Sequence, residues 1–185
     1  MWPRLVAALL IAAGPAAATG IEITVAGEGG NGVIAIDLLE DVAPGHVERI
    51  TSLAASGAYD NVAFHRVIDG FMAQTGDVQH GVLGDGYDAR RAGTGASDMP
   101  DLAQEFSNVP FDAGIVGMAR SSEVDSANSQ FFIMFAPGYF LNNQYTVVGR
   151  VTSGQDVVDA IKKGHPRSGA ITGAPDRIVS VTVTE

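Results

Sequence analysis

The stretch from Ala63 to Asp77, AFHRVIDGFMAQTGD, places a cation and an amide among large apolar side chains. Arg66 is always charged, and its guanidinium carries several N–H donors. Such a group is costly to bury beside apolar side chains unless its surface opens to water or to a polar ligand. The stretch therefore predicts either hydrogen bonding from Arg66 to a bound polar group or an ordinary exposed strand arginine.

The backbone expected for this stretch is a hairpin of two short strands, because β-favouring residues are interrupted by the turn pair Asp69-Gly70. A two-residue loop would place Arg66 and Gln74 on opposite faces of the hairpin. A three-residue loop pairs Ile68 with Met72 instead and brings Arg66 and Gln74 opposite each other on one face. We favour the three-residue loop, which puts a cation and an amide side by side.

The first 18 residues are predicted to be a secretory signal. They contain Arg4, an apolar run from Leu5 to Ala13, the helix-breaking pair Gly14-Pro15, and Ala16–Ala18, which fits an A-x-A cleavage site. The apolar run is about ten residues, well short of the roughly 20 that cross a bilayer as a helix. We expect an exported protein, periplasmic or secreted, with one domain over residues 19–185. An uncleaved amphipathic leader is the alternative.

Charge and cysteine content exclude several classes of protein. The 185-residue chain has a formal net charge of −10 and no cysteine. Without a cluster of Lys and Arg to neutralise phosphates, binding to nucleic acid or anionic lipid is not expected. Without cysteine there is no disulfide, thiolate metal site or lipoprotein anchor. No later segment is long enough for stable insertion into a membrane.

Apolar patterning beyond the leader predicts about eight short strands and two helices. Besides the central hairpin, strands are expected at 21–25, 33–38, 115–118, 131–135, 146–151 and 178–183. One helix is expected from Pro44 to Gly57, with His46 as a solvated surface residue, and a second from Gln155 to Lys163. Short strands with glycine-rich turns favour a mainly all-β fold, a closed eight-stranded antiparallel barrel capped by two α-helices, over a layered α/β sheet.

A long loop region, from Gly76 to Asp101, is dense in Gly, Asp and Arg and has almost no apolar periodicity. Gly84 to Ala89 satisfies a G-x-G-x-x-A pattern, but no proper strand precedes it and no helical period follows, so we treat the match as chance. The aspartates of this region lack the spacing of a calcium loop. They are Asp85, Asp88, Asp98 and Asp101. We expect solvated acids here and neither a metal nor a cofactor.

A second stretch, Met118 to Ile133, supplies small residues, an amide and two adjacent aromatic rings, in MARS followed by DSANSQFFI. Together with FHRVIDGFMAQTGD, this stretch resembles the cyclophilin family of peptidyl-prolyl cis/trans isomerases. The likeness runs from Ile21 to the last expected strand, and two long motifs in the same order make it specific. It implies an antiparallel barrel with a packed interior and a substrate groove on its outer face.

The resemblance also implies a role for each candidate site residue. Arg66 corresponds to the catalytic arginine, and Gln74 is the second candidate catalytic residue. The candidate substrate-binding residues are His65, Phe71, Met72, Ala119, Arg120, Gln130, Phe132, Phe140, Leu141 and Tyr145. Phe, Met and Leu suit a pocket for an apolar pyrrolidine ring because they are large and carry no donors.

The implied activity is rotation of the X-Pro peptide bond without a covalent intermediate, metal or cofactor. The implied partners are proline-containing peptides and unfolded exported proteins, and we expect a monomer. Phe140 replaces the Trp with which many eukaryotic members hydrogen-bond cyclosporin, so weak cyclosporin binding is expected. Tyr145 and Arg120 replace a histidine and an asparagine and are only candidate contacts. The segment Gly81–Met99 is longer than in compact relatives, and either extends the groove rim or, as we favour, only links elements.

Three other classes of protein share features with this sequence. A serine hydrolase is disfavoured because there is no G-x-S-x-G and no suitably placed histidine. A lipocalin-type barrel needs a hollow interior and gives no role to the two motifs. A non-catalytic chaperone that binds or holds Pro-peptides on the same fold stays open as the alternative, because a fold does not dictate activity. The joint presence of Arg66, Phe71, Gln74 and Phe132 argues against it.

Overall fold

The computed structural model describes residues 19–185, and the predicted signal at 1–18 lies outside the described residues. Alternating apolar residues form the opening hairpin of β1 (Gly20–Ala26) and β2 (Gly32–Leu38), as predicted. The other elements are α1 (Pro44–Ala55), β3 (Arg66–Ile68), β4 (Met72–Thr75), β5 (Ile115–Met118), β6 (Phe131–Met134), the 3-10 helix η1 (Tyr139–Leu141), β7 (Val147–Ser153), α2 (Gln155–Ala160) and β8 (Arg177–Thr184). No described helix is long and apolar enough to span a membrane.

The strands form one antiparallel sheet in the order β3-β4-β6-β5-β7-β2-β1-β8. The predicted closure into a barrel is not confirmed, because β3 and β8 at the two edges share no ladder. Only one isolated bridge, between Ala63 and Arg177, joins the chain before β3 to the start of β8. The edge of β3 is already occupied, since Val67 N–H donates to the Gly169 carbonyl at 2.9 Å. The sheet is therefore curled but open.

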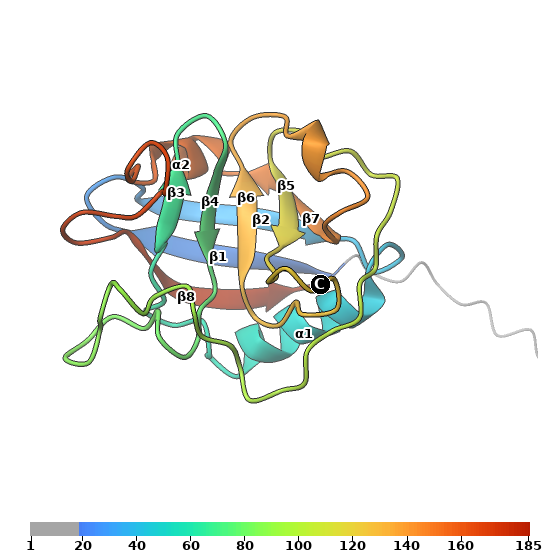
Figure 1. Cartoon of the computed structure of the whole chain (residues 1–185), viewed down its shortest axis with the longest axis horizontal. Helices are drawn as coiled ribbons and strands as arrows, with labels where there is room; N and C mark the ends of the chain where they lie inside the picture. The colour runs from blue at the N-terminus through green and yellow to red at the C-terminus, as the bar shows by residue number, and fades with distance from the viewer. Residues whose placement is uncertain (1–18) are drawn as a thin grey trace, which may run out of the picture.

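Two apolar clusters lie on the two faces of the curled sheet. The inner cluster fills the interior with fully buried residues such as Ile23, Ile34 and Ile133. Helix α1 closes one end with its predicted apolar stripe, and α2 lies at the other end (Figure 1). That stripe consists of Val47, Ile50, Leu53 and Ala54. A smaller outer cluster, which includes Phe111 and Phe132, belongs to the other face, where β4, β6 and β5 meet.

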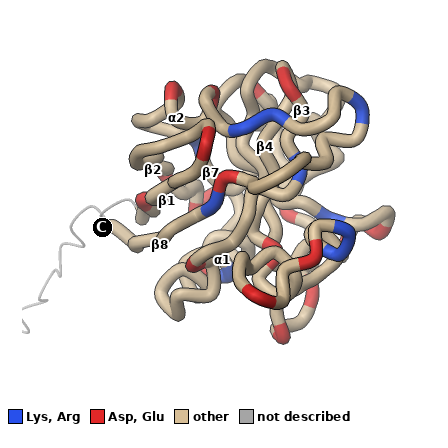
Figure 2. The backbone as a smooth tube through the Cα atoms, turned by 90° about the vertical axis from the view of Figure 1, so that its left-hand side faces the viewer, with Lys and Arg blue, Asp and Glu red and all other residues tan. Residues whose placement is uncertain are grey.

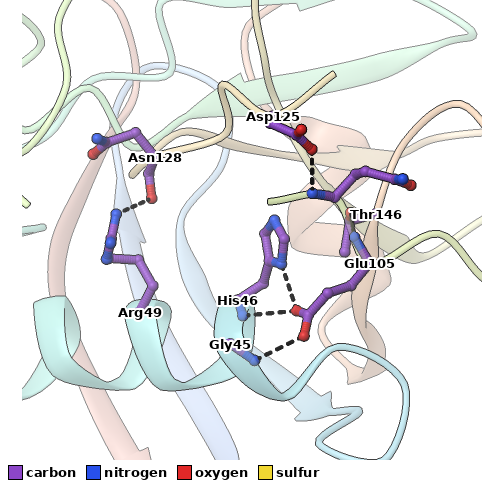
Figure 3. Close-up of polar contacts among 8 residues, drawn as sticks. Gly45, His46, Arg49, Glu105, Asp125, Asn128 and Thr146 are labelled. Carbon is purple, nitrogen blue, oxygen red and sulfur yellow. Dashed lines mark hydrogen bonds and ion pairs between the residues drawn. The ribbon is translucent and has the colours of Figure 1, made fainter. Parts of the chain in front are cut away.

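The His46 side chain is buried, so the prediction of a solvated surface residue at this position is wrong. It is 1% exposed, and its Nδ1 lies 2.6 Å from Glu105 Oε2. The Glu105 carboxylate also accepts the N–H groups of Gly45 at 3.1 Å and His46 at 3.0 Å (Figure 3). These N–H groups belong to the first helical turn and have no partner within the helix, and the Ala43 side chain does not cap them. Glu105 is 59 residues away in sequence from His46, so no local pattern could show this contact.

Replacing Glu105 with Gln is expected to lower the free energy of unfolding at pH 7 by about 1 kcal/mol. Burial alone would raise the pKa of Glu105, but hydrogen bonds from His46 and from the N–H groups of Gly45 and His46 hold that pKa below its ordinary value. A lowered folded-state pKa adds stability above the unfolded pKa, and this stability is lost as pH falls through the folded pKa. Urea unfolding of the wild type and of Glu105→Gln, at pH 7 and at about pH 3.5, tests this prediction. The difference between their free energies of unfolding should shrink in acid. Equal stabilities at pH 7 would contradict the capping role.

Candidate active site

The hairpin of β3 and β4 has the register that a three-residue loop predicts. Arg66 pairs with Gln74 and Ile68 pairs with Met72 across the two strands. The loop depends on Gly70, whose φ of 68° is a left-handed conformation that suits glycine. The cation and the amide therefore lie side by side on one face, as the sequence analysis favoured.

Two oxygen acceptors and, more weakly, the Met72 sulfur hold the Arg66 guanidinium. Its Nη1 donates to Gln74 Oε1 at 3.1 Å, and its Nε donates to the Ser168 carbonyl at 3.3 Å. Within residues 19–185, Nη2 has no hydrogen-bond partner. Burial lowers the pKa of Arg66, yet the group stays charged because the ordinary pKa of an arginine lies far above neutral pH. The site thus holds a fixed cation with N–H donors left for a ligand.

A hollow of about 280 Å³ opens beside this guanidinium on the outer face of the sheet. Its walls come from β3, β4, β6, the residues after β5, and the segment from η1 to Tyr145. The lining residues are Arg66, Phe71, Met72, Gln74, Ala119, Arg120, Phe132, Phe140, Leu141 and Tyr145. Ten of the predicted site residues are therefore brought together, and none of these lining residues is a carboxylate. The hollow combines one apolar wall with one cationic, hydrogen-bonding wall.

The apolar wall is held by stacked aromatic rings. Phe132 is 5% exposed and stacks on Phe111, with ring centroids 5.8 Å apart, while the Tyr145 ring meets Phe132 edge-on at 5.8 Å. Phe140 stays 65% exposed and lies 5.4 Å from the Phe71 ring at the rim. Sequence reasoning missed Phe111, which follows Pro110 outside any strand or helical pattern. It supports the floor from beneath.

Arg120 and Tyr145 lie at the rim and contact each other. The Arg120 guanidinium carbon is 4.5 Å from the centre of the Tyr145 ring, and its Nη2 donates to the Gln144 carbonyl at 2.8 Å. A cation over an aromatic face is attracted by the ring electrons. Arg120 and Tyr145 therefore form one contact in the lining of the hollow.

A second hollow, of about 380 Å³, adjoins the first and shares Gln74, Ala119 and Arg120 with it. Gln130 lines only the second hollow, together with Gly93–Ala96 of the long loop. The segment Gly81–Met99, which we expected only to link elements, therefore does extend the rim of the groove.

His65 is placed differently from its expected position at the groove. It lines neither hollow, it is 9% exposed, and within residues 19–185 neither ring nitrogen has a hydrogen-bond partner. Burial lowers the pKa of His65 more than nearby Asp77 raises it. The His65 ring lies beside Gly93 of the second hollow, and its contact with a substrate stays a prediction.

The site so built is a shallow outer-face groove that can grip a small apolar ring beside a fixed hydrogen-bond donor. Among residues 19–185 no cluster of three or more His, Asp or Glu could hold a metal ion. The family model described as "Cyclophilin type peptidyl-prolyl cis-trans isomerase/CLD" matches residues 21–183. The chain therefore belongs to the cyclophilin-type peptidyl-prolyl cis-trans isomerases.

Several particular proteins are similar to this chain. A probable peptidyl-prolyl cis-trans isomerase of Brucella suis is 57% identical over 153 residues, which is 83% of this chain and 78% of the relative. The peptidyl-prolyl cis-trans isomerase cyp18 of Streptomyces antibioticus is 37% identical over 172 residues, covering 83% of this chain and 90% of the relative. The crystal structure of the cyclophilin AquaCyp293 from Hirschia baltica aligns with a TM-score of 0.70 at 26% identity, covering 88% of this chain and 73% of that structure.

Proposed function

We propose that the 280 Å³ hollow binds the proline ring of an X-Pro segment and that Arg66 accelerates rotation about the preceding peptide bond. The observation that carries this proposal is the Arg66 guanidinium, fixed by Gln74 at 3.1 Å on the edge of an aromatic pocket. Phe132, Met72 and Leu141 offer the proline ring an apolar surface without donors.

The chemistry follows from the electronic structure of the amide. Donation of the nitrogen lone pair into the carbonyl gives a rotational barrier of about 18–20 kcal/mol. The twisted transition state loses this conjugation, so the prolyl nitrogen becomes a better hydrogen-bond acceptor. A donor that meets the nitrogen there binds the transition state more tightly than the ground state, which lowers the barrier. Arg66 is the donor, and Gln74 holds it in place.

The alternative is a chaperone that holds Pro-peptides in the same groove without accelerating rotation. A chymotrypsin-coupled assay with an Ala-Pro peptide separates the two functions. The isomerase predicts that cis-to-trans conversion speeds up in proportion to protein concentration. A holding chaperone predicts an unchanged conversion rate together with suppressed aggregation of an unfolded protein. An unchanged rate at micromolar protein would therefore remove the proposed activity.

We further propose that the chain acts as a monomer on unfolded exported proteins, in the periplasm or outside the cell. The signal-like composition of residues 1–18 supports export. Figure 2 shows Lys and Arg positions scattered among Asp and Glu positions along the backbone, and the net charge of −10 disfavours nucleic acid as a ligand. Fractionation of cells that express the whole chain tests the location: the protein would be in the periplasm or medium, and retention in the cytoplasm would refute export.

Cyclosporin is expected to bind weakly, because Phe140 has no N–H to donate at the rim. Replacing Phe140 with Trp should tighten binding by about tenfold, the value of one well-placed hydrogen bond of about 1.4 kcal/mol. Isothermal titration of both proteins with cyclosporin measures the difference. Nanomolar binding by the unchanged chain would contradict this expectation.

A further inference from the structure

A chain of hydrogen bonds leads from Arg66 away from the hollow into the long loop. Gln74 Oε1 accepts from Arg66, and Gln74 Nε2 donates to Gln130 Oε1 at 3.0 Å. Gln130 Nε2 then donates to two backbone carbonyls of the loop, that of Gly93 at 3.1 Å and that of Gly95 at 2.8 Å. The guanidinium is thus connected to the loop through two amide side chains.

The loop decides which way round the two amides lie. A backbone carbonyl can only accept, so the Gly93 and Gly95 carbonyls require the NH₂ group of Gln130 and turn its oxygen toward Gln74. Gln74 must then present its NH₂ group to Gln130 and its oxygen to Arg66. If the loop moved away, the Gln74 amide could turn its NH₂ group toward the guanidinium, and donor would face donor. The acceptor for Arg66 therefore depends on the position of Gly93 and Gly95.

Asp77 fixes that position from the other side of the loop. Its Oδ2 accepts the N–H groups of Gly93 at 2.7 Å and Gly95 at 3.0 Å. Its Oδ1 accepts those of Gln79 at 3.1 Å and His80 at 2.8 Å. The residue is 0% exposed, so these four donors would be left largely without partners if the carboxylate were removed.

The loop backbone is built around this carboxylate. Gly93 has a φ of 93°, a conformation that L side chains rarely adopt, and a Cβ there would lie 2.7 Å from His65 Cδ2. Burial alone would raise the pKa of Asp77, but the four backbone hydrogen bonds outweigh it and keep that pKa below its ordinary value. Asp77 is thus a fixed anion across the neutral range. The proposed reaction makes no direct use of it, because it lines neither hollow.

We propose that Asp77 is a positioning residue for the isomerase: it clamps Gly93 and Gly95 so that Gln130 and Gln74 present an acceptor to the Arg66 guanidinium. This inference rests on the proposed role of Arg66. It assigns Asp77 no contact with the substrate. Loss of the hydrogen bonds between Asp77 and the loop should misalign the guanidinium and lower kcat. It should leave the affinity of the apolar pocket for proline nearly unchanged.

Steady-state kinetics of Asp77→Asn tests the proposal in two backgrounds, with Arg66 and with Arg66→Ala. Small errors in the placement of a catalytic group cost large factors in rate, so we expect kcat to fall about tenfold with Arg66 present, and KM to change by less than about threefold. With Arg66→Ala, Asp77→Asn should have almost no further effect, because its target is already gone. A kcat within twofold of wild type would overturn the proposal, and so would an equal loss in both backgrounds.

Asp176→Asn is the matched control. Asp176 is 1% exposed, and its carboxylate accepts the N–H groups of Gly29, Gly30 and Lys162, away from both hollows. The Asp176→Asn variant should lose stability as Asp77→Asn does, but should keep the kcat of the wild type.

If Asp77→Asn does not fold, Gln130→Met replaces it. This variant breaks the chain of hydrogen bonds at its middle, and it is compared in the same two backgrounds. Should Arg66→Ala itself leave kcat intact, the proposed function fails. If kcat falls with Arg66→Ala but not with Asp77→Asn, only the positioning role of Asp77 is refuted.

Discussion

Replacing Arg66 with alanine is expected to lower kcat for an Ala-Pro peptide by about 10- to 10²-fold. A hydrogen bond from a charged donor is worth about 1.5–3 kcal/mol, and each 1.36 kcal/mol of transition-state stabilisation is a factor of ten. The apolar wall is untouched by the change, so peptide affinity should stay within a few-fold of wild type.

Arg66→Lys is the informative companion of that variant. A lysine keeps the charge but lacks the planar fork that Gln74 and the Ser168 carbonyl now hold. We expect it to recover only part of the lost rate. The coupled assay gives kcat, calorimetric titration with the peptide gives affinity, and circular dichroism shows whether each variant is folded. Near-wild-type turnover by folded Arg66→Ala would remove Arg66 from the mechanism.

Replacing Phe132 with alanine is expected to have the second large effect, this time on binding as well as rate. Phe132 forms the floor of the hollow between the Phe111 and Tyr145 rings, and it is nearly fully buried. The variant should lose about 3–5 kcal/mol of stability from the cavity it leaves. Its kcat/KM should fall by about 10²-fold, mainly through a higher KM, because the proline ring loses the surface it packs against.

The neighbouring residue provides the control. Phe131 is 1% exposed and belongs to the inner cluster, with its ring edge-on to Tyr59 at 5.6 Å, because successive side chains of β6 point to opposite faces. Phe131→Ala should lose similar stability with little change in KM, measured at a temperature where both variants are folded. Equal losses of kcat/KM in the two variants would mean that Phe132 acts only through stability.

The parts of the site that the sequence predicted are those set by local rules. The Asp69-Gly70 turn located the hairpin, and the cost of burying a guanidinium favoured the register that pairs Arg66 with Gln74. Period-two alternation gave the opening hairpin, and the 3.6-residue stripe gave α1. Each of these depends on residues a few positions apart, where sequence spacing and spatial distance agree.

The parts that sequence reasoning missed depend on contacts between distant segments. His46 has the sequence appearance of a surface residue, and its buried contact is with Glu105, which lies beyond the long loop. Closure of the barrel is not confirmed, since the chain around Gly169 occupies the edge of β3, which no strand pattern indicates. Asp77 looks like one more acid in a glycine-rich loop, and its role depends on four backbone donors that meet at one carboxylate.

The central claim is that the Arg66 guanidinium lowers the barrier of a proline bond that the pocket has already bound. Exchange NMR spectroscopy of an Ala-Pro peptide, with a catalytic amount of protein, measures this most directly because it observes interconversion at equilibrium. We predict exchange peaks between the cis and trans proline signals with the wild type. With Arg66→Ala we predict binding shifts but no exchange peaks. Exchange at the wild-type rate with folded Arg66→Ala would contradict the account.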